Sequence, residues 1–387
     1  MEEVMERKAF KNKMIFFFSW FRSKPKGSAI EYGINRTISI FVIMLILIFT
    51  SCQKDPVETV FFDFSNKPGV FILNEGNFMY GNASLSFYSN SDERTYQNIF
   101  SSRNKAPLGD VAQSMKLHQG LAWIVVNNSG KIYAANENTM EFKGSVTGLS
   151  SPRYIEFIND EKAYVSDLYA ESIHIINPKI YQKTGEISLS GGAYQRSAEQ
   201  MIQKGDSIYT NCWNNGNEIL LINSQSDELM GSLEVGAQPQ SMVLDSKNKL
   251  WVLCDGGYEG HPQFWERPEL LKIDTRTMEI EKKFFFDNNS SPSNLQIHKD
   301  TLYYINQDIY RLSIFDAQLP QEAFIESPYS DDYGGFYSLG IHPVTSDIYI
   351  ADAIDHQQNG VIYHYNSKGE LIHSFNAGVN PGYFSFK

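Results

Sequence analysis

A repeating unit of 41 to 52 residues is the feature of this sequence that most limits how the chain can fold. Each unit carries a short apolar segment with an aromatic residue at its centre: Phe71, Trp123, Tyr164, Tyr209, Trp251, Tyr303 and Tyr349. A second apolar segment, a polar turn and a third segment usually follow, and several units open with a Pro-led alternating segment. Four short antiparallel strands per unit at this period are typical of a β-propeller blade. We therefore predict an all-β fold, a seven-bladed β-propeller, with the central aromatics packed between neighbouring sheets.

The last residues of the sequence supply a strand that the first unit lacks. We name the four strands of a blade A to D from the central axis outward. The first unit has candidates for B (70–74), C (84–89) and D (97–100), but nothing suitable for A. The segment from Pro381 to Phe386 follows a complete last unit and repeats the Pro-led pattern of an A strand. We predict that it enters blade one as the innermost strand and closes the ring, which removes exposed strand edges.

The N-terminal region has the pattern of a secretory signal. An apolar run at 38–49 follows Arg36 and precedes Thr50 and Ser51. A basic flank, an apolar core of this length and small residues before the cut indicate a signal peptide, and the core is too short to span a membrane as a helix. A short membrane anchor is the alternative. Residues 1–33 precede a signal that looks complete without them, and this suggests an over-extended gene start.

Cys52 and the residues before it resemble the lipobox of bacterial lipoproteins. The resemblance implies that the Cys52 thiol is lipidated, and two or three acyl chains would anchor the chain durably to a membrane. The following Gln53, Lys54 and Asp55 resemble the tag of lipoproteins on the outer surface of the outer membrane, although a solvated tether explains them nearly as well. We predict a leader and signal peptide at 1–51, a lipidated tether at 52–68 and the propeller at 69–387.

Charge and composition narrow the classes of partner. Residues 52–387 contain 25 basic and 41 acidic side chains, which argues against nucleic acid and against electrostatic docking on anionic lipid. Aromatic residues make up 14% of the chain, with 22 tyrosines, and they suit both strands and binding surfaces. Beyond Cys52 only Cys212 and Cys254 remain, in equivalent places of adjacent blades, where we expect buried thiols and no disulfide.

Several framework segments resemble the YncE/YVTN-type propeller lipoproteins. They include 73–78, 163–167, 250–254, 347–353 and the terminal 381–387. The resemblance spans the whole mature chain. It implies a surface protein that captures a ligand beside a TonB-dependent transporter, as the BtuG-type corrinoid-binding propellers and related siderophore-capture propellers do. These segments belong to the framework, so they identify the fold better than the ligand.

The long connections are expected on one face. In a propeller the B–C and D–A connections share one end of the ring, here called the top face, and the A–B and C–D turns share the lower face. The long connections lie at 190–197, 255–268, 327–337 and 353–360, nearly all on the top face, whereas the lower turns are short. Long loops on a rigid scaffold commonly carry binding sites. The predicted ligand-binding residues lie in these connections, in the first blade's loop and in the segment 211–216, and they are aromatic, basic or histidine side chains: Phe78, Tyr80, Tyr194, Arg196, Trp213, Tyr258, Trp265, Arg267, Tyr333, Tyr337 and His356.

Aromatic side chains offer large contact area with little rotamer entropy to lose, and Arg suits carboxylate or phosphate groups. We therefore expect a bulky small-molecule ligand, cobalamin-like or an iron chelate, that is passed to a TonB-dependent transporter by an outer-membrane lipoprotein facing the cell exterior. Packing of the loops against one another is the alternative role of these side chains. No catalytic residue, metal site or cofactor is predicted.

Two other functions stay open. Propeller hydrolases of the lactonase or esterase type bind calcium where acidic and amide groups converge at the channel mouth. The third residue after each central aromatic should lie there, but this set includes only two carboxylates, Asp167 and Asp352. Nucleophile elbows and phosphate-cradling glycine loops are also missing from the sequence. A protein-binding scaffold or adhesin is the second alternative.

Overall fold

The computed structural model describes residues 60–192, 195–260, 265–329 and 335–387. The predicted signal peptide and the lipidation site Cys52 lie outside these residues. Within the described part of the chain, no helix is long and apolar enough to cross a membrane.

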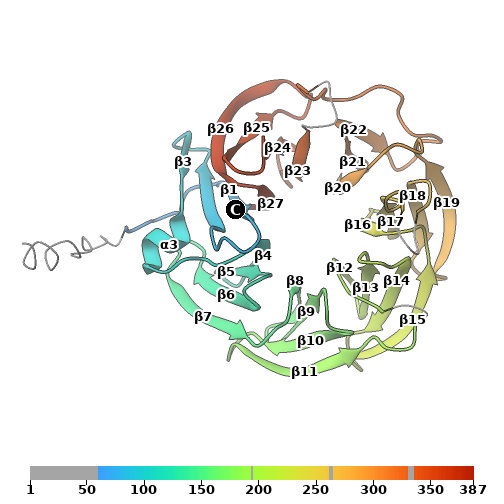
Figure 1. Ribbon diagram of the computed structural model, residues 1–387, viewed down its shortest axis with the longest axis horizontal. Coiled ribbons are helices and arrows are strands. Elements are labelled where there is room, and N and C mark those ends of the chain that lie inside the picture. The colour runs from blue at the N-terminus through green and yellow to red at the C-terminus, as the bar shows by residue number, and fades with distance from the viewer. Residues whose placement is uncertain (1–59, 193–194, 261–264, 330–334) are drawn as a thin grey trace, which may run out of the picture. The chain divides into compact units, whose positions relative to one another are not determined.

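The described residues form a ring of seven antiparallel β-sheets around a central channel, as predicted (Figure 1). The innermost strands A of blades one to seven are β27 (Pro381–Phe386), β4 (Ala112–His118), β8 (Pro152–Asn159), β12 (Met201–Lys204), β16 (Pro239–Leu244), β20 (Ser293–His298) and β23 (Phe336–Ile341). Strands B are β1 (Gly69–Asn74), β5 (Leu121–Val126), β9 (Lys162–Asp167), β13 (Ser207–Cys212), β17 (Lys249–Cys254), β21 (Thr301–Asn306) and β24 (Ile348–Asp352). Strands C are β2 (Ser84–Ser89), β6 (Lys131–Asn136), β10 (Ser172–Asn177), β14 (Glu218–Asn223), β18 (Glu269–Asp274), β22 (Asp308–Ser313) and β25 (Asn359–Tyr365). Strands D are β3 (Arg94–Tyr96), β7 (Phe142–Thr147), β11 (Gln182–Ser188), β15 (Glu228–Glu234), β19 (Glu279–Phe285) and, in blade seven, β26 (Leu371–Val379).

The predicted closure of the ring is confirmed. β27 pairs antiparallel with β1, from Val70 opposite Phe386 to Asn74 opposite Pro381. Phe384 packs with Ile72 and Tyr349 in an apolar cluster shared by blades one and seven. The last strand of the chain therefore completes the first sheet and joins it to the last one.

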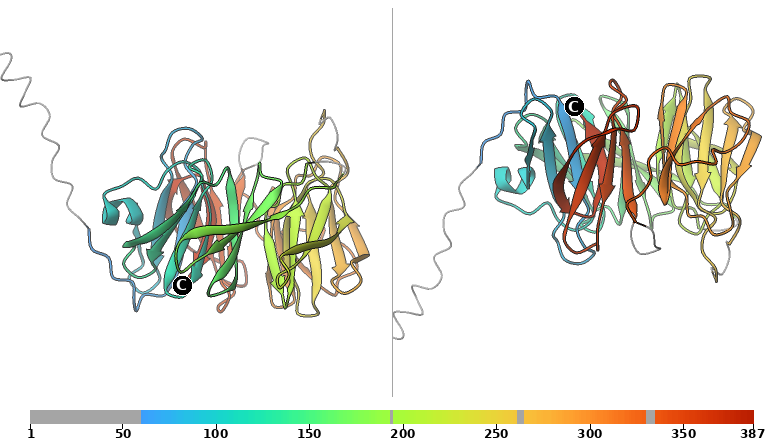
Figure 2. Two further views of the ribbon diagram at one scale, coloured as in Figure 1. Left: turned by 90° about the horizontal axis from the view of Figure 1, so that it is seen from below. Right: turned by 90° about the horizontal axis from the view of Figure 1, so that it is seen from above.

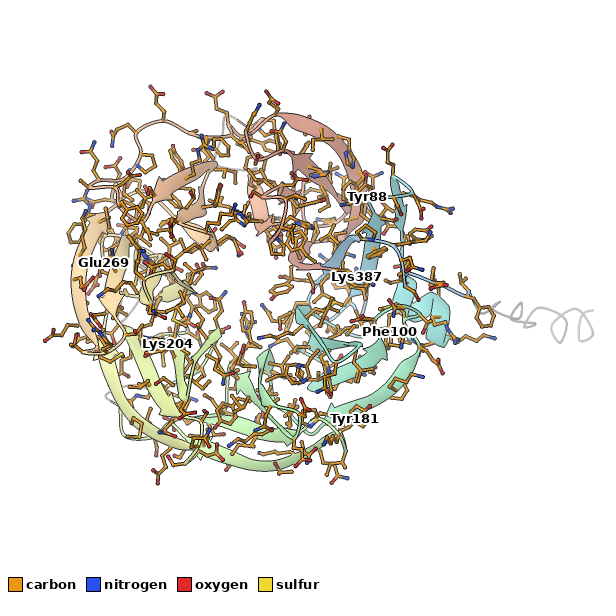
Figure 3. The ribbon with its side chains drawn as sticks, turned by 180° about the vertical axis from the view of Figure 1, so that it is seen from behind. Tyr88, Phe100, Tyr181, Lys204, Glu269 and Lys387 are labelled. Atoms are coloured by element: carbon orange, nitrogen blue, oxygen red, sulfur yellow. The ribbon has the colours of Figure 1, made fainter. Side chains whose placement is uncertain are left out.

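The seven central aromatics lie in the seven B strands, and each is at most 5% exposed. Several also contact the next blade. The Tyr209 hydroxyl of blade four donates to the Thr275 carbonyl oxygen of blade five at 2.9 Å. Trp123 of blade two faces the ring of Tyr181 in blade three, which lies near the outer edge of the ring in Figure 3. The periodic aromatics are therefore framework residues, as predicted.

Blade one differs from the sequence prediction at its outer edge. Its D strand is β3, and residues 97–100 do not form it. Ile99 instead begins the short helix α3 (Ile99–Asn104). Ile99 and Phe100 are buried, and the Phe100 ring packs at 4.8 Å from that of Tyr133 in blade two. Two consecutive apolar side chains can be buried on one helix surface, whereas a strand would turn one of them to solvent.

Blade six has three strands among the described residues, not the predicted four. β22 ends at Ser313, and the following segment meets its sheet through a single bridge between Ile309 and Ile325. Ile325 is 6% exposed and joins the blade six–seven core. One apolar side chain and one bridge therefore take the place of an outer strand.

Part of the predicted tether packs on the propeller. Phe64 is 1% exposed, and its ring lies 4.4 Å from that of Phe87 in β2. Phe62 and Tyr96 extend this aromatic cluster over the outer side of blade one. The described residues before Gly69 thus contribute to the core of blade one.

Candidate functional site

Blades one and seven place four predicted residues at the top face. Phe78 and Tyr80 follow β1 and are 65% and 79% exposed. The loop that carries them is fixed, because the Met79 N–H donates to Asp110 Oδ2 at 2.8 Å and the Asn77 N–H donates to Asn82 Oδ1 at 2.7 Å. Exposed aromatics on a rigid loop form a preorganised contact surface.

Tyr337 and His356 lie beside this loop. Their rings are 5.4 Å apart, and Asn77 Nδ2 donates to the His356 carbonyl oxygen at 2.5 Å. The Tyr337 hydroxyl donates to Glu75 Oε2 at 2.7 Å. Phe78, Tyr80, Tyr337 and His356 are called the first rim group below.

Trp213, Tyr258 and Trp265 of blades four and five form the second rim group. Trp213 Nε1 donates to Asp255 Oδ2 at 3.0 Å, and a β-bridge joins Gly257 to Trp265. Trp265 is 60% and Tyr258 61% exposed. The loop projects from the face opposite the C-terminal residue (Figure 2). Because blades four and five lie across the ring from blades one and seven, the two rim groups flank the channel (Figure 1).

Two predicted residues contact other parts of the protein, and three lie outside the described residues. Arg196 is buried, and its Nε and Nη2 donate to the two oxygens of Glu218 at 2.8 and 2.7 Å. Arg267 donates to the Phe286 carbonyl oxygen and lies over the Phe285 ring at the outer side of blade five. The two oxygens of Glu218 therefore occupy the Arg196 guanidinium, whereas Arg267 is exposed and donates through its Nε, and ligand contact by either arginine stays a prediction. Tyr194, Tyr333 and Cys52 lie outside the described residues.

A polar layer at the top of the channel was missed by sequence reasoning. In five blades the layer uses the same A-strand position, three residues before the one that pairs with the central aromatic: Gln113, Arg153, Glu199, Gln240 and Tyr337. Blade one has Gly382 there, and the Glu75 carboxylate takes up the space that a Cβ at Gly382 would need. This set, with Glu75, is called the upper layer.

Hydrogen bonds connect the charged members of the upper layer. Arg153 Nε donates to Glu199 Oε2 at 2.8 Å, and Arg153 Nη1 donates to Gln113 Oε1 at 2.6 Å. Burial raises the pKa of Glu199, against the opposing effect of Arg153. Burial also raises the pKa of Glu75, opposed by the Tyr337 hydrogen bond and the Arg153 charge. For Arg153, burial alone would lower the pKa of the guanidinium, but Glu199, Tyr154 and Glu75 raise it.

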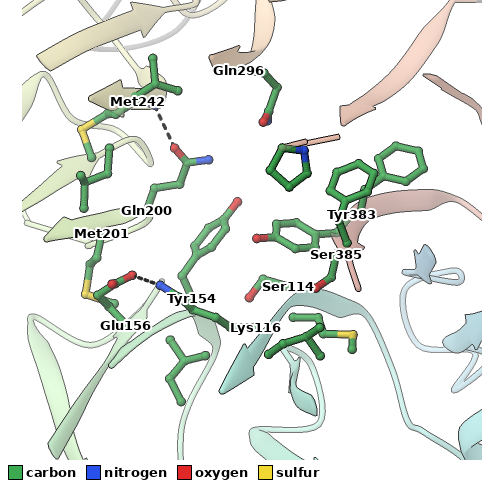
Figure 4. Close-up of a pocket in the computed structure, with 18 of the residues that line it drawn as sticks. Ser114, Lys116, Tyr154, Glu156, Gln200, Met201, Met242, Gln296, Tyr383 and Ser385 are labelled. Carbon is green, nitrogen blue, oxygen red and sulfur yellow. Dashed lines mark hydrogen bonds and ion pairs between the residues drawn. The ribbon is translucent and has the colours of Figure 1, made fainter. Parts of the chain in front are cut away.

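Below the upper layer, the A strands enclose a cavity of about 460 Å³. Tyr154 of blade three and Tyr383 of blade one point their hydroxyls into it, and Gln200 and Gln296 face it as well (Figure 4). Gln200 Oε1 accepts the Met242 N–H at 2.9 Å, so its NH2 group faces the channel. A Lys116–Glu156 ion pair of 2.5 Å lies lower in the same wall. A pocket of this volume with several convergent polar groups is suited to a small molecule.

The B-strand ends considered for calcium serve the protein itself. Asp167 accepts the N–H groups of Ser150 and Ser151 and faces His174 Nε2 at 3.2 Å. Burial opposes ionisation, but His174 and these N–H groups lower the pKa of Asp167 to about 2. Within the described ranges no three His, Cys, Asp or Glu side chains gather as a metal site.

Cys212 and Cys254 are buried free thiols, as expected from the sequence. Burial raises the pKa of Cys212 to about 12 and that of Cys254 well above its usual value. Neither thiol is therefore a nucleophile at neutral pH.

The sequence did contain a signal for the upper layer. The pairing register between strands A and B fixes which A-strand residue lies at the upper layer of each blade. Charged side chains are rarely buried, so an Arg or Glu at this position is unusual. Arg153 and Glu199 stand out only when the A strands are aligned on the central aromatics. The β-bulges between strands A and B obscure that alignment.

Comparisons with known proteins agree with the fold. The model of the family described as "Domain of unknown function (DUF5074)" matches residues 68–385. No curated protein sequence matches the chain. Similar solved structures include a quinonprotein alcohol dehydrogenase-like protein from Bacteroides thetaiotaomicron (14% identity, 84% of this chain and 79% of that chain, TM-score 0.63). They also include an inactive virginiamycin B lyase from Staphylococcus aureus with quinupristin (14%, 76% and 95%, 0.55) and AztD from Citrobacter koseri (9%, 82% and 97%, 0.53). At these identities the likeness concerns the fold alone.

Proposed function

Since the chain belongs to this domain family of unknown function, its role has to be argued from its own site, and we propose that it captures a bulky small molecule on the top face of the propeller. The ligand class is a cobalamin-like corrinoid or an iron chelate. The protein is a lipoprotein anchored through Cys52 to the outer membrane, faces the cell exterior, and passes the ligand to a TonB-dependent transporter.

The two rim groups carry this proposal. They place exposed aromatic rings on opposite sides of one channel mouth, with side chains of up to 79% exposure on loops that hydrogen bonds hold in place. Exposed large apolar side chains that are preorganised in this way are typical of binding surfaces, because little conformational entropy is lost on contact. A ligand that spans the mouth would contact both groups at once, and this favours a large ligand over a small one.

Thermal unfolding of the folded chain with cobalamin and with ferric siderophores tests the ligand class. A ligand present at a hundred times its Kd stabilises the native state by about 2.7 kcal/mol. Tyr80→Ala and Trp265→Ala should each weaken binding, since truncation of an aromatic anchor removes a large contact area. Phe315→Ala is the matched control, because Phe315 is 68% exposed and lies at the lower face.

No stabilisation by any member of the panel would contradict the corrinoid and iron-chelate classes. Equal binding by all three variants would show that the ligand does not use the rim groups. The anchor is tested separately, because Cys52→Ser should abolish incorporation of a labelled fatty acid and release the protein from the membrane fraction.

A further inference from the structure

The loops that carry the two rim groups are acidic. They contain seven Asp or Glu residues, one arginine, Arg267, and no lysine. These loops are the segments 75–83, 213–217, 255–268, 327–337 and 353–358. The Arg267 guanidinium lies over the Phe285 ring at the outer side of blade five. An anionic ligand at the channel mouth would therefore meet an excess of negative charge.

The carboxylates of the rim loops lack cationic partners. Glu259, Glu266 and Asp355 are exposed, and none of them forms an ion pair in the described part of the chain. Asp110, which accepts the Met79 N–H of the first rim group's loop, forms none with the described residues either. Backbone N–H groups that follow Asp355 lower the pKa of its carboxyl, so this group is ionised at neutral pH. The rim loops thus offer carboxylate charge that the protein itself does not neutralise.

Several carboxylates of the lower turns, by contrast, have a cation of the protein beside them. Glu161 pairs with Lys179 at 2.8 Å, and Asp227 pairs with Lys162 at 2.8 Å. Charge is therefore balanced locally at these turns, whereas it is left unbalanced at the rim.

The exposed rings of the rim are also without a cation. In other parts of the chain basic side chains lie over aromatic rings, as Lys282 does over Phe284 at 4.3 Å. Among the described residues, no Lys or Arg lies over Phe78, Tyr80 or Trp265. The face of an aromatic ring carries partial negative charge and attracts a cation. Rings and carboxylates at the channel mouth consequently favour the same sign of charge in a ligand.

We propose that the rim groups select a positively charged ligand, so that the captured corrinoid or iron chelate presents a cationic group to the exposed rings and carboxylates. This inference rests on the capture proposed above and narrows it by the sign of the charge. Attraction to the acidic loops speeds the encounter with a cation, and contact with the rings slows its release. Anionic iron complexes are repelled by the same charges.

Binding of two ligand series to the full folded chain tests the sign of the charge. Ferrioxamine B carries a free ammonium group, its N-acetyl derivative is neutral at that end, and its N-succinyl derivative carries a carboxylate. The second series is cyanocobalamin with one peripheral amide left intact or converted to an aminoethyl amide or a carboxylate. In a series that binds, the ammonium member should bind about three- to fivefold more tightly than the neutral one, and the carboxylate member should bind most weakly. The differences should shrink at about 1 M salt, where the Debye length falls to about 3 Å.

Two variants with the same change in net charge locate the effect. Glu259→Lys adds a cation to the loop of the second rim group and should at least halve the preference for the ammonium member. Glu93→Lys is the control, because Glu93 is exposed and lies in the lower turn before β3. It should leave the preference unchanged. Both side chains are exposed, and thermal unfolding checks that both variants are folded.

Equal binding of all three members of a series, or tightest binding of the carboxylate member, would overturn the inference and leave capture of that ligand body intact. An unchanged preference in Glu259→Lys would also overturn it, as would an equal loss in both variants, because the preference would then come from overall charge. Absence of binding by every member of both series would contradict the proposed function, and this inference with it.

Discussion

The A strands on the two sides of the channel have the same register but carry different side chains. The side formed by blades two to four is called the charged wall, and the side formed by blades five to seven the uncharged wall. Two positions of each A strand are compared: the upper-layer position and the residue that pairs with the central aromatic, three positions later. Blades two to four have Arg153 and Glu199 at the first and Lys116 and Glu156 at the second. Blades five and seven have Gln240 and Tyr337 at the first, and blade five has Val243 at the second. The register to the central aromatic is the same on both sides. The framework therefore fixes where a side chain meets the channel, and the residue type alone decides whether that wall carries charge.

Removal of the Arg153 guanidinium should have the largest effect on the free energy of unfolding. Arg153→Met leaves the buried Glu199 carboxylate without its ion-pair partner, and breaking a buried ion pair on one side destabilises by about 3–5 kcal/mol. Urea unfolding measures the loss. Gln240→Met, at the equivalent position of the uncharged wall, should destabilise by about 1 kcal/mol, since it only removes the acceptor of the Asn294 N–H. Similar losses in the two variants would show that the walls do not differ energetically.

A second substitution should recover part of that loss. In the double variant Arg153→Met with Glu199→Gln, no carboxylate remains at Glu199, so the double variant should be more stable than Arg153→Met by about 1–3 kcal/mol. A double-mutant cycle by urea unfolding gives the coupling between the two side chains. Additive losses would mean that the ion pair contributes nothing beyond its separate parts.

The contribution of Glu199 to the free energy of unfolding should depend on pH, with an effect of intermediate size. Burial raises the folded-state pKa of Glu199 above its usual value of 4.5. The protonated form is therefore favoured in the folded state, and this contribution to stability is fully present below about pH 4.5 and is lost as pH rises through the folded pKa. The difference in free energy of unfolding between the wild type and Glu199→Gln should consequently change with pH over that window. A constant difference from pH 4 to 8 would contradict the raised pKa.

The smallest effect is expected on the uncharged wall. The Gln296 side chain lines the cavity, and its amide group makes no hydrogen bond among the described residues. Gln296→Ala should therefore change the free energy of unfolding by no more than about 0.5 kcal/mol. A loss above about 1 kcal/mol in urea unfolding would show that the amide supports the wall.

The sequence allowed the framework to be predicted because the framework repeats. Seven buried aromatics at a steady period gave the blade number, and the Pro-led segment at 381–386 gave the closing strand with its correct bounds. Where a blade departs from the repeat, prediction failed. Ile99 and Phe100 form part of a helix, and one bridge at Ile325 replaces a strand in blade six.

The site was harder to predict because it depends on partners that are distant in the sequence. Arg196 has the residue type of a ligand contact, but Glu218 engages it in the folded chain. Arg153 and Glu199 are 46 residues apart and meet only because their blades are neighbours. Composition identified the aromatic rim, whereas the buried charges required the register of each A strand.

The pairing of Phe71 with Ser385 sets a condition on how the chain acquires its native state. More than three hundred residues separate the two strands, so contacts of very long sequence separation must form before blade one has its inner strand. Earlier blades can assemble during synthesis, but the edge of β1 stays unpaired until β27 arrives. The interval before that arrival is the period in which the chain is most exposed to strand-edge association with another copy.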